Sequence, residues 1–241
     1  MTICVYILPR FSQSFLEPMP APALIFDLDG TLVDTAPDLL GATNAVMAHR
    51  GLPGIAPDML RHLVGHGARA LIERAMETAG AAVTAQELPA LLEVFLAHYR
   101  EHIADGSVVF PGVHETLADL KAQGARLAVL TNKPQELTDR LLPVIGLDPY
   151  FAEVYGAGRM DYVKPDARIF HDVVRDVGGS EGGTVMIGDS ITDLKTAQAA
   201  GAPCILFSYG YTPVPARELG ADMVLDDFRE LPGALKALGI L

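Results

Sequence analysis

The chain has 241 residues, half of them hydrophobic, and carries a formal net charge of −12 at pH 7. This length can bury one large core, or a core with a small second domain, and the composition is that of a folded globular protein. The acidic charge, without any basic tract, excludes nucleic acid and anionic membrane surfaces as favoured partners. No uncharged apolar stretch reaches the roughly 18 to 20 residues that a membrane helix needs.

The first twenty residues, MTICVYILPRFSQSFLEPMP, contain a short apolar patch with no basic residue before it. They also lack a small-residue cleavage site, so they do not resemble a secretory signal, and we expect residues 1–20 to be a disordered extension. Met19 is an alternative start just before the first strand. The two cysteines, Cys4 and Cys204, lie far apart and form neither a metal-binding cluster nor a disulfide framework. This usage favours a reducing cytoplasm.

Short apolar runs alternate with helical segments along most of the chain. The predicted strands are 23–27, 125–131, 184–188, 203–207 and a shorter run at 222–225. The predicted helices are 111–123, 134–145, 165–177, 191–200 and 213–219. Buried strands separated by helices predict an α/β fold, with a Rossmann-like, doubly wound parallel sheet and helices on both faces.

The stretch between the first two predicted strands contains only helical signals. Residues 37–50 are predicted to form one helix, and Gly and Pro residues at 51–57 and 65–67 indicate breaks. A later segment places apolar side chains on one helical stripe: Leu88, Leu91, Leu92, Phe95, Leu96, Tyr99 and Ile103. We therefore predict an all-helical cap at 36–106, inserted into a core made of 21–35 and 107–241.

The first predicted strand ends in two aspartates, in the stretch ALIFDLDGTLVDT. Asp27 and Asp29 are two residues apart, so they point the same way if the strand continues that far. Ligands of open parallel sheets bind at the carboxyl ends of strands. Two carboxylates this close repel each other unless a cation or a shared proton intervenes. A turn at Asp29-Gly30 explains the second aspartate only, so the pair favours a functional site.

Two further segments carry polar groups suited to the same site. The second strand ends in Thr131-Asn132, whose hydroxyl and amide groups can hold phosphate oxygens, although such a pair is also a common helix cap. Lys164 precedes a predicted helix, and a single lysine in that position is usually just solvated. Each segment alone is weak evidence for a site.

The predicted strand at 184–188 ends in the stretch MIGDSITD. Asp189 lies at the strand end, and Asp193 follows one helical turn later. Ser190 and Asp193 match the pattern of a capping box, which accounts for Asp193 but leaves Asp189 unexplained. Carboxylate oxygens are suitable ligands for Mg²⁺, whereas lysine and hydroxyl donors suit a phosphoryl group. The four segments together are far more specific evidence for a site that binds Mg²⁺ and a phosphoryl group than any one of them alone.

The stretches FDLDGTLVDT, VLTNKP, VKP and MIGDSITD resemble, in family order, the motifs of the haloacid dehalogenase superfamily of phosphotransferases. The stretches GHGARALIERA and GDSITDLKTAQAAGAPCILFSYGY are most similar to bacterial phosphoglycolate phosphatases. The resemblance implies a Mg²⁺-dependent cytoplasmic phosphatase that forms an aspartyl phosphate and converts 2-phosphoglycolate to glycolate and phosphate. Monomer and dimer are equally compatible with the sequence.

Several alternatives stay open beside this substrate. One is a phosphatase of another small ester, such as a sugar phosphate, pyrophosphate or a nucleotide, and another is a phosphosugar mutase. No lysine occurs before Lys121, which disfavours relatives that use a lysine of the cap. A non-enzymatic binding protein would show at least one damaged catalytic position, and the sequence shows none.

By this resemblance, Asp27 is the nucleophile and Asp29 is the general acid and then the general base. Thr131 and the amide of Asn132 would bind the oxygens of the transferring phosphoryl group. Lys164 would offset negative charge between the nucleophile and that group.

The resemblance also implies a Mg²⁺ site and a substrate-binding cap. The metal residues would be Asp27, Asp29 through its backbone carbonyl, Asp189, and Asp193 as a group that orients a metal-bound water. In the cap, Arg69, Arg74 and His66 are candidates to bind a substrate carboxylate, because a guanidinium group binds carboxylate with two hydrogen bonds. The alternative for each of these three is a solvated helix face.

Overall fold

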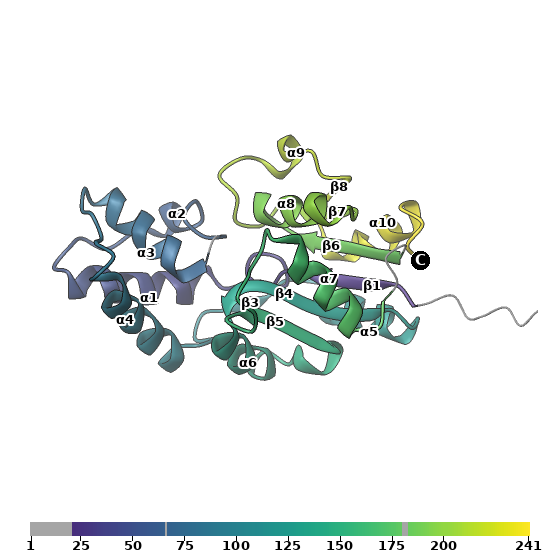
Figure 1. The fold of residues 1–241 in the computed structure, drawn as a ribbon, viewed down its shortest axis with the longest axis horizontal. Coiled ribbons are helices and arrows are strands. Elements are labelled where there is room, and N and C mark those ends of the chain that lie inside the picture. Colours follow the sequence, from purple (N-terminus) through teal and green to yellow (C-terminus); the bar gives the residue numbers. More distant parts are fainter. Residues whose placement is uncertain (1–20, 66, 180–182) are drawn as a thin grey trace, which may run out of the picture.

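A computed structural model describes residues 21–65, 67–179 and 183–241 of the chain. A six-stranded parallel sheet lies at the centre of the fold, in the order β5-β4-β1-β6-β7-β8 (Figure 1). These strands are β1 (Ala23–Phe26), β4 (Arg126–Pro134), β5 (Glu153–Ala157), β6 (Thr184–Gly188), β7 (Cys204–Phe207) and β8 (Met223–Leu225). The predicted α/β fold is confirmed. The predicted extension at 1–20 lies outside the described residues.

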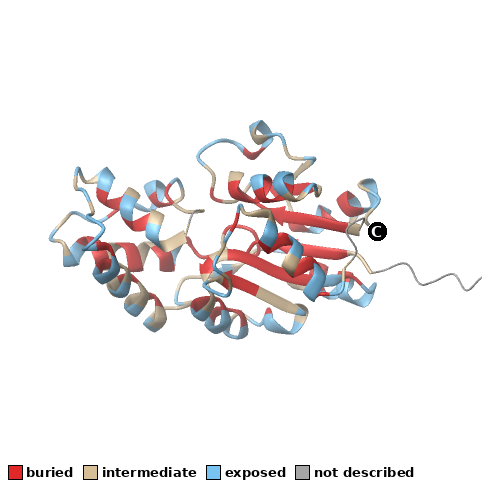
Figure 2. Cartoon of the chain, viewed as in Figure 1, coloured by how far each residue is buried: buried red, intermediate tan, exposed pale blue. Residues whose placement is uncertain are grey.

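The sheet is buried on both faces because its central strands are apolar throughout. All four residues of β1 are buried, and β1 lies between β4 and β6 (Figure 2). Leu24 and Phe26 pack on one face, with α5 (Val113–Ala122), α6 (Gln135–Val144) and α10 (Leu231–Ala237). Ile25 packs on the other face, with α7 (Ala167–Asp176) and α8 (Ile191–Ala200). This two-sided burial requires the continuous apolar runs seen in the sequence.

The strand β5 at Glu153–Ala157 was not predicted, and it changes the position of Lys164. The lysine lies in the loop between β5 and α7 rather than directly after a strand, and α7 begins at Ala167 rather than at 165. The helix predicted at 213–219 is the shorter α9 (Ala216–Leu219). All other predicted strands and helices of the core are present, with ends that differ by a few residues.

The helical segment between β1 and β4 has a hydrophobic core of its own. It contains α1 (Ala36–His49), α2 (Pro57–Leu60), α3 (Gly67–Thr78) and α4 (Leu88–Glu101), which lie together beside the sheet (Figure 1). Within the predicted stripe, Leu88, Leu91, Phe95 and Tyr99 are buried and the other three residues are half-buried. The two connections to the core, β2 (Val33–Asp34) and β3 (Val108–Val109), pair as antiparallel strands. No helix among the described residues is both long and apolar enough to cross a membrane.

Candidate active site

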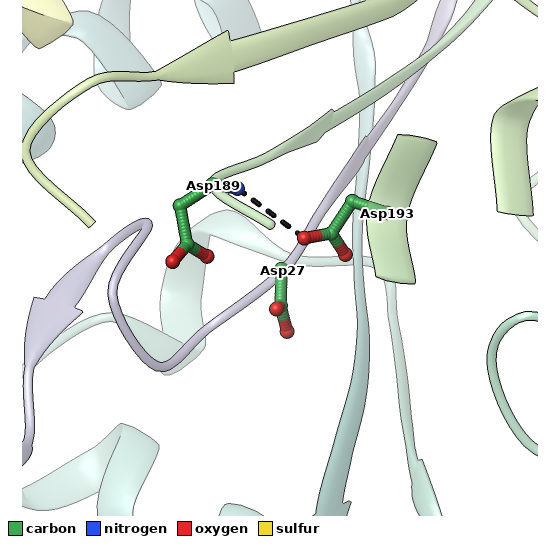
Figure 3. A group of neighbouring side chains, drawn as sticks. All are labelled: Asp27, Asp189 and Asp193. Atoms are coloured by element: carbon green, nitrogen blue, oxygen red, sulfur yellow. Dashed lines mark hydrogen bonds between the residues drawn. The ribbon is translucent and has the colours of Figure 1, made fainter. Parts of the chain in front are cut away.

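Three buried aspartates meet at the carboxyl edge of the sheet. Asp27 directly follows β1, Asp189 directly follows β6, and Asp193 lies in the first turn of α8 (Figure 3). One carboxylate oxygen from each residue lies within 4.8 Å of the others. The sheet order explains the meeting, because β1 and β6 are adjacent parallel strands.

Lys164 neutralises part of this charge. Its Nζ lies 2.9 Å from Oδ1 of Asp27 and 2.6 Å from Oδ1 of Asp193, and its side chain is almost fully buried. The other oxygen of Asp193 accepts hydrogen bonds from the backbone N–H of Asp189 and from the backbone and hydroxyl of Ser190 (Figure 3). Asp193 therefore caps α8 and also orients Lys164 toward Asp27.

Asp27 and Asp189 are hard to ionise without a further cation, because the pKa of each is raised. Burial raises the pKa of Asp27 to about 7, although the Lys164 charge lowers it, and the Asp193 charge adds to the rise. Burial and the charges of Asp193 and Asp27 raise the pKa of Asp189 well above its ordinary value. For Lys164, burial favours the neutral amine, but the two carboxylates outweigh it and raise the pKa.

The residues present suit a divalent cation with a preference for oxygen ligands. Asp189 is held in place by Thr31, whose hydroxyl donates to Oδ1 at 3.0 Å, and by the backbone N–H of Tyr211, which donates to Oδ2 at 2.6 Å. On Asp27, Oδ1 accepts from the Leu28 N–H and from Lys164. Oδ2 of Asp27 accepts no hydrogen bond from any described residue. A cation among these oxygens would remove the repulsion that raises both pKa values.

Two glycines allow the loops around the cluster to approach it closely. Gly30 has a positive φ of 82°, and a Cβ at this position would lie 2.7 Å from Oδ2 of Asp189. A Cβ at Gly210 would overlap the Asp189 side chain itself. A side chain at either position would therefore displace Asp189.

Asp29 has partners of its own, apart from the three clustered aspartates. Its Oδ1 accepts a hydrogen bond from the Thr35 hydroxyl at 2.8 Å. Lys133 Nζ lies 3.0 Å from Oδ1 and 3.4 Å from Oδ2 of the same carboxylate. The Lys133 ammonium also donates to the hydroxyl of Tyr99, a residue of α4. Asp29 thus lies where the sheet meets the helical segment.

A cavity of about 40 Å³ lies between the sheet edge and the helices. Asp27, Asp29 and Lys164 line it together with Thr131 and Asn132, which end β4. The helical segment contributes further lining residues: Leu39, Val64, Gly65, Gly67, Ala68, Leu71, Phe95 and Tyr99. The structure therefore brings the sequence-predicted core residues to one enclosed space.

Asn132 is held close to the lysine loop. Its Nδ2 donates to the backbone carbonyl of Lys164 at 3.1 Å, whereas its buried Oδ1 has no hydrogen-bond partner among the described residues. The Thr131 hydroxyl accepts from the backbone N–H of Lys133 at 3.2 Å and keeps its own proton for another acceptor.

The candidate cap residues Arg69 and Arg74 do not line this cavity. The Arg69 side chain is 68% exposed and pairs with Glu73, one turn along α3. Arg74 donates to the backbone carbonyl of Leu63. Both contacts lie within the helical segment. They are the contacts expected of arginines on a solvated helix face or with a structural role. His66 lies outside the described residues.

Three residues that the sequence reasoning left without a role belong to the site. Lys133 and Tyr99 hold Asp29, and the backbone of Tyr211 holds Asp189. The Tyr211 hydroxyl also accepts from the Ala36 N–H and donates to Asp34, the last residue of β2. Lys133 directly follows the predicted site residues Thr131 and Asn132 in the sequence. This position was the one sequence feature that could have indicated that Lys133 belongs to the site.

The fold and the site define a class of α/β protein with an acidic centre that could hold a cation at the carboxyl edge of a parallel sheet, beside a helical insert. The chain matches the haloacid dehalogenase-like hydrolase family over residues 24–207, and it belongs to that family. This membership confirms the predicted resemblance and the prediction of a hydrolase.

Relatives with the same overall length agree with the assignment. The chain is 47% identical to a phosphoglycolate phosphatase of Caulobacter vibrioides, with 92% of the chain and 94% of the relative covered. It is 42% identical to a phosphoglycolate phosphatase of Agrobacterium fabrum, with 89% and 92% covered. A crystal structure from Haemophilus somnus, described as a predicted phosphoglycolate phosphatase, superposes with a TM-score of 0.83 at 32% identity, covering 89% of this chain and 97% of that one.

Proposed function

We propose that the protein is a Mg²⁺-dependent phosphatase that hydrolyses 2-phosphoglycolate. The observation that carries the proposal is the buried Asp27 carboxylate, whose Oδ2 accepts no hydrogen bond from a described residue while Lys164 and Asp189 lie beside it. A nucleophile in a buried site needs a free oxygen and a nearby positive charge for the phosphoryl group. The relatives named above support the substrate.

The positions of the described side chains support a reaction in two steps. Oδ2 of Asp27 attacks phosphorus and forms an aspartyl phosphate while the ester oxygen leaves. Asp29 protonates the leaving oxygen and then takes a proton from the water that hydrolyses the aspartyl phosphate. Lys164 and the Thr131 hydroxyl stabilise the charge on the phosphoryl oxygens, and Asn132 binds the same oxygens through its backbone amide.

The metal site would use Asp27, Asp189 and the backbone carbonyl of Asp29. Mg²⁺ bound there would neutralise the clustered carboxylates and polarise a phosphoryl oxygen. Both oxygens of Asp193 already accept hydrogen bonds from the protein, so Asp193 would orient its neighbours rather than bind the metal directly.

Residues 36–106 would act as a cap that closes over the substrate and excludes water during the attack. The cavity between the cap and the sheet is lined by residues of both parts, as such a closure over the substrate requires. Cytoplasmic location is part of the proposal, and the buried, unpaired Cys204 fits a reducing compartment.

The test is phosphate release from a panel of esters, with Mg²⁺ and with a chelator. The panel contains 2-phosphoglycolate, sugar phosphates, pyrophosphate and a nucleoside monophosphate. We expect activity that depends on Mg²⁺, with the highest kcat/KM for 2-phosphoglycolate. A preference for a sugar phosphate would refute the substrate but not the mechanism, and an Asp27→Asn variant as active as the parent would refute the nucleophile.

A further inference from the structure

Lys133 is a buried lysine to which the proposed reaction assigns no task. Lys133 and Lys164 are the buried lysines among the described residues, at 4% and 3% exposure. Burying an ammonium group is costly unless it is paired and hydrogen-bonded. Lys133 meets this requirement with Asp29 on one side and the hydroxyl of Tyr99 on the other, and its Nζ also lies 4.2 Å from the centre of the Tyr99 ring. The cation is therefore fixed between the sheet and α4.

The ammonium group of Lys133 holds one of its three contacts only loosely. A lysine side chain has three N–H donors, and Lys133 Nζ lies 3.0 Å from Oδ1 and 3.4 Å from Oδ2 of Asp29 and also donates to the Tyr99 hydroxyl. Lys133 also lines the cavity at the sheet edge. The contact to Oδ2 of Asp29 is long, so the N–H that makes it can turn to an acceptor bound in that cavity.

Among the described residues that line this cavity, no further cation is present for a second anionic group of the substrate. The cationic residues of the described cavity lining are Lys133 and Lys164, and Lys164 is already bound to Asp27 and Asp193. Arg69 lies outside this lining and pairs with Glu73.

We propose that Lys133 determines specificity by binding the carboxylate of a short phosphorylated hydroxy acid. The inference rests on the proposed function, in which Asp29 protonates the ester oxygen of the substrate. In that role Asp29 contacts both the ester oxygen and Lys133, so only the Asp29 carboxylate separates the Lys133 ammonium group from the ester oxygen. In 2-phosphoglycolate, a single methylene separates the ester oxygen from the carboxylate carbon, so the carboxylate reaches the same neighbourhood.

The charge balance of the cavity makes this contact decisive. Asp27, Asp29 and Asp189 all line the cavity, and they would repel a substrate carboxylate. A charge-assisted hydrogen bond to Lys133 offsets that repulsion only for substrates that carry the carboxylate. An ester of a neutral alcohol gains nothing from Lys133. An analogue without the carboxylate would leave the buried Lys133 charge without this contact, so the site should discriminate strongly against it.

The experiment compares two esters of similar size, 2-phosphoglycolate and 2-hydroxyethyl phosphate, in the parent and in Lys133→Met. We expect the variant to lose roughly 10- to 100-fold in kcat/KM for 2-phosphoglycolate, mainly through KM, and much less for 2-hydroxyethyl phosphate. The matched control is Lys236→Met, which removes an exposed lysine of α10 and should leave both values unchanged. Lys133→Arg keeps the charge and should retain part of the preference.

Each outcome has a distinct meaning. If the parent itself shows no preference for 2-phosphoglycolate, both the proposed substrate and the role of Lys133 are refuted. If the parent prefers it and Lys133→Met loses activity equally on both esters, Lys133 only positions Asp29, and the specificity inference alone is wrong. Should Lys133→Met fail to fold, Lys133→Gln gives the same comparison, because it keeps a hydrogen-bond donor and lacks the charge.

Discussion

The variant Asp27→Asn should gain stability while it loses activity, provided that no metal is bound. The amide keeps the size of the side chain and an oxygen that can accept from Leu28 and Lys164. It removes one of three buried carboxylates whose oxygens lie within 4.8 Å of one another. The substitution also removes the proposed nucleophile, and kcat should fall by roughly a thousandfold or more.

The magnitude follows from the pKa of Asp27, which burial raises from 3.8 to about 7. Each pKa unit corresponds to about 1.4 kcal/mol, so ionised Asp27 costs the folded state at most about 4 kcal/mol. Because the folded-state pKa is raised, this cost is absent below the unfolded pKa, grows as the pH rises, and is constant above about pH 7. The variant should therefore gain about 4 kcal/mol at pH 8 and less than about 2 kcal/mol at pH 5.

Thermal unfolding in the presence of a chelator measures this gain. For a chain of this size, 4 kcal/mol corresponds to a rise in Tm on the order of 10 °C. Asp119→Asn, which changes an exposed carboxylate of α5, is the control and should leave Tm almost unchanged. Saturating Mg²⁺ should reduce the difference, because it stabilises the parent more than the variant. An equal gain at pH 5 and pH 8, or a loss of stability at pH 8 with chelator, would refute the electrostatic reasoning.

Three further predictions concern the surroundings of the cluster. Gly210→Ala should lower kcat/KM by roughly a hundredfold in activity assays, because the added methyl group displaces the Asp189 carboxylate. The control is Gly233→Ala, where the added methyl group has open space around it and should leave kcat/KM unchanged. Burial favours a higher pKa for Asp34, but hydrogen bonds from Tyr211 and Arg61 lower it. The stability contributed by this carboxylate is therefore present above the unfolded pKa of about 4 and is lost progressively as the pH falls below it, so Asp34→Asn should lower Tm more at pH 7 than at pH 3. Finally, Mg²⁺ should raise the Tm of the parent in a concentration-dependent way, in a titration monitored by thermal unfolding.

The sheet and its acidic edge could be predicted because their signals are local. The strand at Ala23–Phe26 is a continuous apolar run, and the aspartates that follow it break that run abruptly. A parallel sheet places all such breaks at one edge, so strand type predicts that Asp27 and Asp189 share this edge, and the adjacency of β1 and β6 then brings them together. Lys164 was placed at the same site, although it lies on a longer loop than expected.

The remaining features depend on contacts that no local pattern encodes. The strand Glu153–Ala157 lies at the sheet edge with several half-buried residues, so it lacks an apolar run. The role of Lys133 depends on Tyr99, which periodicity identifies only as a core residue of a helix. Tyr211 holds Asp189 through its backbone N–H, which every residue except proline has. The residue type at this position therefore could not indicate a role in the site.

The central position of β1 also has a consequence for the order of folding. Leu24 lies opposite Leu127 and Val185, both more than a hundred residues later in the chain. The first strand therefore has no neighbour in the sheet until most of the polypeptide has left the ribosome, and contacts of such long sequence separation form slowly. Until then its apolar side chains stay exposed. We expect the nascent chain to need protection from aggregation during synthesis, and catalytic competence to appear only late in translation.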